Sequence, residues 1–111
     1  MTNRGATGEV VDLDTTGMAL GVFRGLGYRV NMEHTLEVGD VLLMTTDGAW
    51  ECRNNDNMVF GRERLKRRLK RLADRPPREL LKTIHEDVKK HVGTRGLSDD
   101  LTLGIVMRVD P

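Results

Sequence analysis

The sequence predicts an α+β fold, a mostly antiparallel β-sheet with two helices packed on one of its faces. This prediction depends on the order of the hydrophobic patterns along the chain. Segments typical of strands come first, two segments with a helical period follow, and one more strand pattern ends the chain. A run of strands followed by a run of helices favours separate sheet and helix layers over alternating parallel units.

Four segments carry the strand pattern, separated from one another by turn or helical sequence. Residues 9–13 are a short candidate, followed by a glycine-rich loop over residues 15–27. Residues 28–36 alternate strictly between apolar and polar side chains, which predicts a strand with one buried face. Residues 41–44 are continuously apolar, which is typical of a strand covered on both faces. Residues 101–109 alternate again and predict the last strand.

Two amphipathic helices are predicted between the last two strands. Their apolar stripes consist of Leu65, Leu69 and Leu72 in the first helix and of Leu80, Leu81, Ile84, Val88 and Val92 in the second. The sequence Asp-Arg-Pro-Pro at residues 74–77 ends the first helix, and Pro77 suits the first turn of the next one. Gly93 is placed to end the second helix.

Length and composition narrow the class of protein. At 111 residues the chain is expected to be a single domain, with residues 1–8 flexible. It has no run of about 18 apolar residues that could span a membrane. Its N-terminus also lacks the apolar core of a signal peptide, so we expect a cytoplasmic protein. The one cysteine, Cys52, excludes an internal disulfide and is expected to be a small buried side chain.

The net charge of +1 hides a marked asymmetry. Residues 61–95 carry 13 Lys/Arg against 5 Asp/Glu, a balance of +8, and the rest of the chain has a balance of −7. The basic run over residues 62–71 could belong to a nucleic-acid-binding helix, or it could be an ordinary solvated helix face. No aromatic residue is interleaved with it, so an acidic protein partner is favoured over nucleic acid.

Carboxylates at two predicted strand ends are the candidate site. Asp47 follows the strand over 41–44 on an Asp-Gly turn, and Asp99 and Asp100 begin the last strand. Such carboxylates, without a cysteine or histidine cluster, suit hard cations such as Mg²⁺ or Mn²⁺. The alternative is that they are turn residues only. The histidines at positions 34, 85 and 91 are too scattered to form a site.

Four short motifs, taken in order, point to a family. They are Gly-Asp at 39–40, Thr-Asp-Gly at 46–48, Phe-Gly at 60–61 and Ser-Asp-Asp-Leu-Thr at 98–102. With these motifs the chain, from about residue 8 to its end, resembles the second half of a SpoIIE-type phosphatase domain. These bacterial metal-dependent serine/threonine protein phosphatases are related to type 2C phosphatases, so the resemblance implies a partial version of the type 2C α-β-β-α sandwich.

The resemblance also implies roles for particular residues. Asp47, Asp99 and Asp100 would be ligands of a dinuclear Mn²⁺ or Mg²⁺ centre at one edge of the sheet. Asp47 and Asp99 would be its catalytic residues. Gly48 would shape the turn that lets Asp47 face the metals. The reaction would be hydrolysis of phosphoserine or phosphothreonine by a metal-activated water. The substrate would be a phosphorylated regulatory protein, such as an anti-sigma factor antagonist.

One departure from the family pattern limits these expectations. Nothing in residues 1–16 matches the segment that carries the family's other metal-binding aspartate. The chain is therefore expected to be the C-terminal part of a phosphatase domain, with little activity in isolation. The alternative is a catalytically inactive, phosphatase-like remnant that serves as a protein-binding module. Because a half-domain would leave apolar sheet surface uncovered, a homodimer or higher oligomer is also expected.

Overall fold

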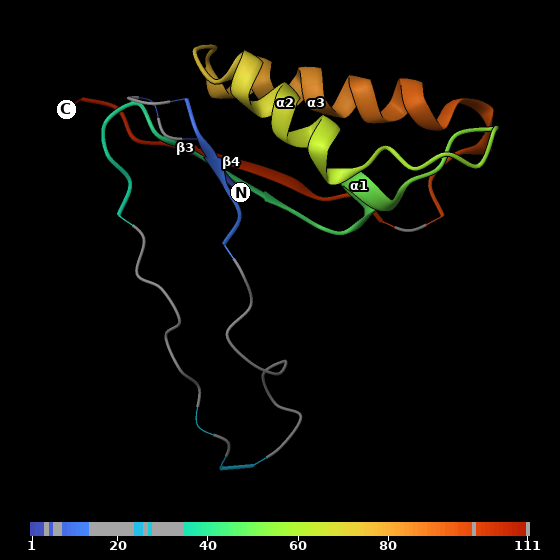
Figure 1. Ribbon diagram of the computed structural model, residues 1–111, viewed down its shortest axis with the longest axis horizontal. Coiled ribbons are helices and arrows are strands. Elements are labelled where there is room, and N and C mark those ends of the chain that lie inside the picture. Colours follow the sequence, from blue (N-terminus) through green and yellow to red (C-terminus); the bar gives the residue numbers. More distant parts are fainter. Residues whose placement is uncertain are drawn as a thin grey trace.

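The computed structural model describes residues 1–3, 5, 8–13, 24–25, 27, 35–98 and 100–110. These residues form a four-stranded antiparallel sheet with two long helices lying side by side over one face, as Figure 1 shows. The α+β architecture predicted from the sequence, with its helices on one face of the sheet, is thereby confirmed.

The sheet has the strand order β2-β1-β3-β4, and each neighbouring pair is antiparallel. The strands are β1 (Thr2–Asn3), β2 (Val10–Val11), β3 (Val41–Thr45) and β4 (Leu103–Met107). The longest pairing joins β3 and β4, from Val41 opposite Met107 to Thr45 opposite Leu103. Strands on either side of the helical region thus lie next to each other.

Strand β1 was not expected from the sequence, which suggested a flexible segment over residues 1–8. Thr2 and Asn3 are buried, and they pair with β2 on one side and β3 on the other. The Met1 carbonyl extends this pairing by accepting a hydrogen bond from the Leu43 N–H at 2.8 Å. A strand of two polar residues carries no hydrophobic period, so only its tertiary pairing reveals it.

The strand predicted over residues 28–36 falls mainly outside the described residues, because residues 28–34 are not among them. Thr35 and Leu36, which are described, belong to no helix or strand. The segment over 9–13 contains β2 at Val10–Val11, so that prediction is confirmed at its centre.

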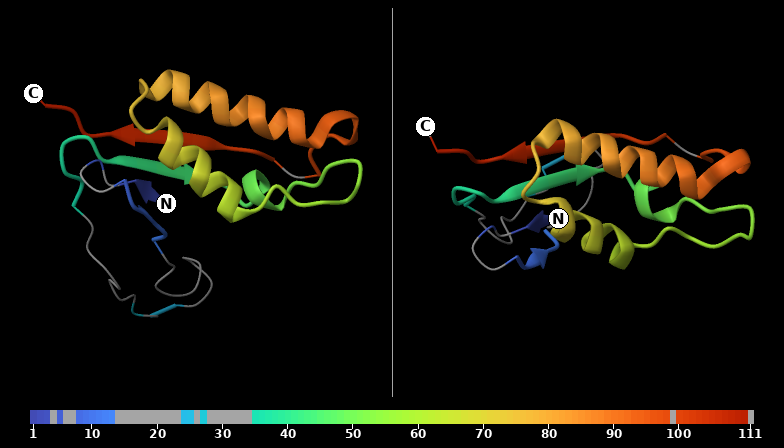
Figure 2. Two further views of the ribbon diagram at one scale, coloured as in Figure 1. Left: turned by 45° about the horizontal axis from the view of Figure 1, so that its top comes forward. Right: turned by 90° about the horizontal axis from the view of Figure 1, so that it is seen from above.

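The two long helices, α2 (Arg62–Leu72) and α3 (Pro77–Val92), follow the predicted pattern closely. The short helix α1 (Gly48–Glu51) and a 3₁₀ turn, η1 (Gly93–Arg95), were not predicted. Pro77 is in the first turn of α3, and Gly93 ends that helix with a φ of 54°, a conformation that favours glycine. Figure 2 shows α2 and α3 covering the sheet from above. None of the described helices is long and apolar enough to cross a membrane.

The core lies between the two long helices and the sheet. It consists of Val41, Leu43, Ala49, Cys52, Phe60, Leu65, Leu69, Leu72, Leu80, Ile84, Val88 and Val92. The predicted leucine stripe of α2 is therefore buried along its whole length. From β4, Leu103, Ile105 and Met107 pack against this core while remaining half-buried.

Within the part of the chain that the structure describes, the other face of the sheet is open, which corrects one expectation. The continuous hydrophobicity of residues 41–44 predicted cover on both faces of the strand, but Met44 is 50% exposed. Val106 on β4 is 43% exposed. Because side chains alternate between the faces of a strand, helices on one face bury Val41 and Leu43 and leave their neighbours uncovered.

We predict that Leu69→Ala lowers the free energy of unfolding by about 2–5 kcal/mol, the usual cost of removing a buried leucine side chain. Leu69 is fully buried in the core between α2 and the sheet. Urea denaturation followed by circular dichroism measures the change, and Met58→Ala, at a side chain 64% exposed, is the control. Equal midpoints for the two variants would contradict this packing.

Candidate metal centre

Asp47 lies just beyond the end of β3, where the chain turns into the short helix α1. Its backbone carbonyl accepts hydrogen bonds from the N–H groups of Trp50 and Glu51, at 3.2 and 3.0 Å. Its side chain makes no hydrogen bond as the N-cap of α1, and the residue is exposed. The Asp47 carboxylate oxygens are therefore not hydrogen-bonded to the start of the helix, so they can serve as metal ligands.

Thr46 ties this turn to the residues that precede β4. Its N–H donates to the Thr102 carbonyl at 3.1 Å, and its hydroxyl oxygen accepts from the Thr102 N–H at 3.0 Å. The same hydroxyl group donates to the Asp100 carbonyl oxygen at 3.2 Å. Three hydrogen bonds from one residue therefore hold the segment with Asp100 against the turn with Asp47.

Gly48 is needed at this point because two backbone segments approach each other closely. Its backbone is helical, so it supplies no left-handed turn. A Cβ atom at this position would instead lie 2.8 Å from the Asp100 carbonyl oxygen. Only glycine lets α1 begin this close to the backbone of Asp100, so Gly48 sets the spacing between the two acidic segments.

The structure brings together only part of the predicted acidic set. Asp47 and Asp100 lie on segments that are bonded to each other through Thr46, and both residues are exposed. Asp99 is outside the described residues, so its predicted closeness to Asp47 stays a prediction.

The oxygen donors at this edge of the sheet are of the type that binds a hard cation, but the described residues supply too few of them. Carboxylate and hydroxyl oxygens are the ligands that Mg²⁺ and Mn²⁺ prefer. However, no group of three or more His, Cys, Asp or Glu side chains among the described residues is arranged to hold a metal ion. These residues alone therefore supply fewer ligands than a dinuclear centre requires.

Sequence reasoning passed over one carboxylate in this region, that of Glu51. It lies four residues after Asp47, on the same side of the single turn of α1. Together with Gly48 and Ser98 it lines a hollow of about 270 Å³. The spacing of four between the two acidic residues is the signal that could have singled it out.

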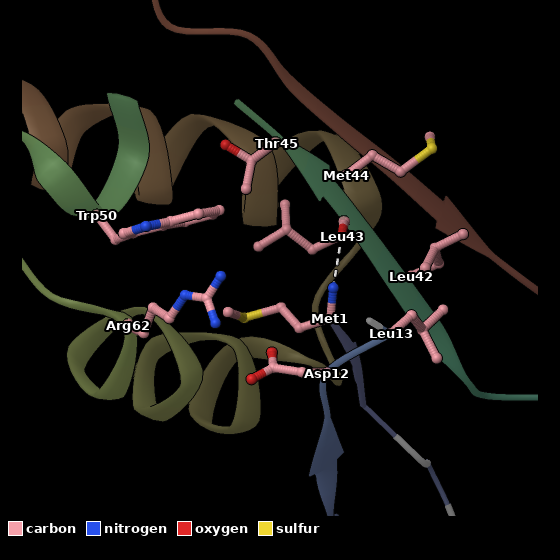
Figure 3. Close-up of a pocket in the computed structure, with 9 residues that line it drawn as sticks. All are labelled: Met1, Asp12, Leu13, Leu42, Leu43, Met44, Thr45, Trp50 and Arg62. Atoms are coloured by element: carbon pink, nitrogen blue, oxygen red, sulfur yellow. Dashed lines mark hydrogen bonds between the residues drawn. The ribbon is translucent and has the colours of Figure 1, made fainter. Parts of the chain in front are cut away.

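A larger hollow of about 500 Å³ lies beside β3, and Figure 3 shows the residues that line it. Trp50 faces Arg62 across it, with the guanidinium carbon 4.7 Å from the ring centroid. Trp50 also packs against the core. At another side of the hollow Asp12 forms an ion pair with Lys66 at 2.8 Å, and this hydrogen bond raises the pKa of Lys66.

Cys52 does not compete as a nucleophile. It is 4% exposed, and its Sγ donates to the Ala49 carbonyl at 3.6 Å. Burial raises the pKa of the Cys52 thiol, so the reactive thiolate is disfavoured. The prediction of a small buried side chain at this position is confirmed.

Comparison with known proteins agrees with the fold and the motifs. An antiparallel sheet covered on one face by two helices, with a Thr-Asp-Gly turn against the start of an Asp-Asp-x-Thr segment, is what the resemblance to phosphatases implied. The family described as Stage II sporulation protein E (SpoIIE) matches residues 2–109, and the chain therefore belongs to this family.

The chain is also similar to the phosphoserine phosphatase RsbU of Bacillus subtilis (strain 168). The two are 30% identical over 97 residues, which cover 87% of this chain and 28% of RsbU. The chain thus matches little more than a quarter of the length of this relative. No solved structure matches the chain significantly.

We predict that Gly48→Ala destabilises the protein by about 1–3 kcal/mol, because the added methyl group meets the Asp100 carbonyl. Helix propensity alone would predict the opposite, since alanine is better than glycine in a helix by about 1 kcal/mol. Gly27→Ala is the control, because a Cβ there would meet nothing within 4 Å. Thermal unfolding compares the variants, and a more stable Gly48→Ala protein would contradict the close approach.

Proposed function

We propose that this chain is the C-terminal portion of a metal-dependent protein phosphoserine/phosphothreonine phosphatase. The observation that carries the proposal is the Asp47 turn. In a chain of the SpoIIE family, it presents a carboxylate not used for helix capping beside the backbone of Asp100. Membership of the family supports the reaction class, and the similarity to a phosphoserine phosphatase supports the phosphorylated side chain that would be hydrolysed.

In this proposal Asp47, Asp99 and Asp100 would hold the cations, Mn²⁺ or Mg²⁺. A bound metal pair would supply a water molecule of lowered pKa and positive charge for the phosphoryl oxygens. The chain's own residues position the ligands, because Thr46 and Gly48 hold the two acidic segments at a close, defined spacing. The proposed substrate is a phosphorylated regulatory protein of the cytoplasm, such as an anti-sigma factor antagonist.

A second function is also proposed, because the described residues supply an incomplete set of metal ligands. The described residues contain no acidic or histidine group large enough for a metal ion, and the chain covers 28% of its relative RsbU. A catalytically inactive, phosphatase-like module that binds proteins through the same scaffold fits these two facts. The two functions differ in whether the chain binds Mn²⁺ through Asp47.

We predict weak Mn²⁺ binding to the isolated chain, with a dissociation constant of about 10⁻⁴ M or weaker, because a small number of ligand charges limits affinity for hard cations. The free-ion signal in electron paramagnetic resonance measures binding. Asp47→Asn should abolish this binding, and Asp56→Asn, in an exposed loop, should not.

Turnover of p-nitrophenyl phosphate with Mn²⁺ is expected to be close to background for the same chain. Robust hydrolysis that Asp47→Asn abolishes would show that the site is complete. Identical Mn²⁺ binding by the wild-type and Asp47→Asn proteins would remove Asp47 from the proposed ligand set and favour the protein-binding module.

We also propose that this chain forms a homo-oligomer through the open face of its sheet. Leu13, Met44 and Val106 are exposed large apolar side chains on the β-sheet portion, with exposed fractions of 41%, 50% and 43%. Large apolar patches are uncommon on the surfaces of soluble monomers, so side chains of this kind favour a covering partner. A second copy would cover it with side chains of the same character.

Sedimentation velocity at about 100 μM, where even weak association registers, tests this proposal. We predict a dimer or larger species for the wild-type chain. Met44→Lys with Val106→Lys should give a monomer, because each charge would be buried without a partner in the interface. Met58→Lys with Val59→Lys, at exposed side chains of the loop before α2, is the control and should leave association intact. A monomeric wild-type protein would contradict the proposal.

A further inference from the structure

Helix α2 carries an arginine stripe, defined as Arg64, Arg67, Arg68 and Arg71. Their spacing of i, i+3, i+4 and i+7 places them on one face of the helix. The four side chains line a hollow of about 360 Å³. The leucines that bury α2 against the sheet lie on a different face, so the arginine stripe is not part of the core.

Two members of the stripe are fixed in place by neighbouring groups. The Arg64 guanidinium lies 4.3 Å from the centroid of the Phe60 ring and donates to His91 Nδ1 at 3.1 Å. His91 in turn donates from Nε2 to the Met58 carbonyl at 2.9 Å, which is the tautomer that lets Nδ1 accept. Both partners of Arg64 are uncharged in this arrangement, so they orient its positive charge without neutralising it.

Arg68 is fixed by an ion pair, with its Nε 3.2 Å from Asp87 Oδ2 on α3. The angles do not make this contact a hydrogen bond, and Asp87 Oδ2 has no other partner among the described residues. The contact therefore orients Arg68 by charge attraction, without a hydrogen bond.

Arg67 and Arg71 are exposed, and among the described residues neither forms an ion pair. Like charges at helical spacings of three and four destabilise a helix by a few tenths of a kcal/mol each. The stripe thus holds positive charges that repel one another, two of them already oriented. An anionic partner would relieve this repulsion at a small cost in conformational entropy.

From this arrangement we propose that the arginine stripe of α2 binds an acidic segment of a partner protein, most simply a helix with carboxylates at the matching spacing. Arginine forms paired hydrogen bonds with carboxylates, and four such groups along one helix face match one face of a second helix. This interaction is separate from the proposed phosphatase chemistry and does not depend on metal binding.

Two features favour a protein over nucleic acid as the partner. Among the described residues, the aromatic rings near α2 are not available for stacking on bases, since Phe60 is buried and Trp50 packs against the core under Arg62. Glu63 and Asp87 also lie beside the stripe and would repel a continuous phosphate backbone. Discrete carboxylates on a helix can avoid these two positions.

The test uses the full chain and a fluorescent alanine-based helical peptide with glutamates at i, i+3, i+4 and i+7. Fluorescence anisotropy measures binding, which should weaken as NaCl increases. Arg67→Glu with Arg71→Glu should weaken binding by about tenfold or more, because two attractive contacts become repulsive. Arg67→Gln with Arg71→Gln, which only removes charge, should have a smaller effect in the same direction, and circular dichroism verifies that each variant is folded.

The matched control is Arg78→Glu with Lys82→Glu, the same change in net charge at exposed residues of α3. It should alter binding by less than about twofold, since charges outside the contact act only through a screened field. The proposal is overturned by equal losses in both charge-reversal variants or by no binding of the glutamate peptide. Tighter binding of a short DNA duplex than of the peptide at the same salt concentration would also overturn it.

Discussion

The antiparallel pairing of β3 with β4 is the interaction on which the rest of this structure depends. It joins two apolar segments that the helical region separates in sequence. The same pairing provides the surface on which α2 and α3 bury their leucine and aliphatic stripes. Beyond the last paired residues, Thr46 continues the contact by hydrogen bonds to Thr102 and Asp100, so the ladder leads directly into the candidate metal centre.

The entrance to β3 is held by a buried carboxylate, that of Asp40. Its two oxygens accept hydrogen bonds from the N–H groups of Gly5 and Glu37, both at 2.9 Å. Since a buried charge is stable only when it is hydrogen-bonded, these contacts set the position of the turn before β3 and of the segment around β1. The second residue of the Gly-Asp motif is therefore structural in this chain, whereas Asp47 of the Thr-Asp-Gly motif presents an exposed carboxylate.

Positive and negative side chains occupy different parts of the fold. The acidic residues of the candidate metal centre lie at the ends of the strands, while α2 contributes the arginine stripe from the helical layer. A protein built in this way can present two surfaces of opposite charge without placing either in the core. The sheet face that bears Met44 and Val106 forms a third surface with exposed apolar side chains, and it differs from both in the kind of contact it can make.

The sequence by itself determined the α+β class, both long helices with their buried stripes, the strands β3 and β4, and the family. These features follow from local periodicity, from Pro77 and Gly93, and from short motifs. Only the tertiary structure revealed β1, the open face beside Met44, and the reason for Gly48. A polar strand of two residues has no hydrophobic period. The exposure of Met44 depends on what packs against it from other segments. The close contact of Gly48 is with a backbone atom of Asp100, which is far away in the sequence. Such contacts between distant segments leave no local pattern. The sequence therefore identifies Asp47 as a candidate ligand, but not the spacing between its turn and the segment with Asp100.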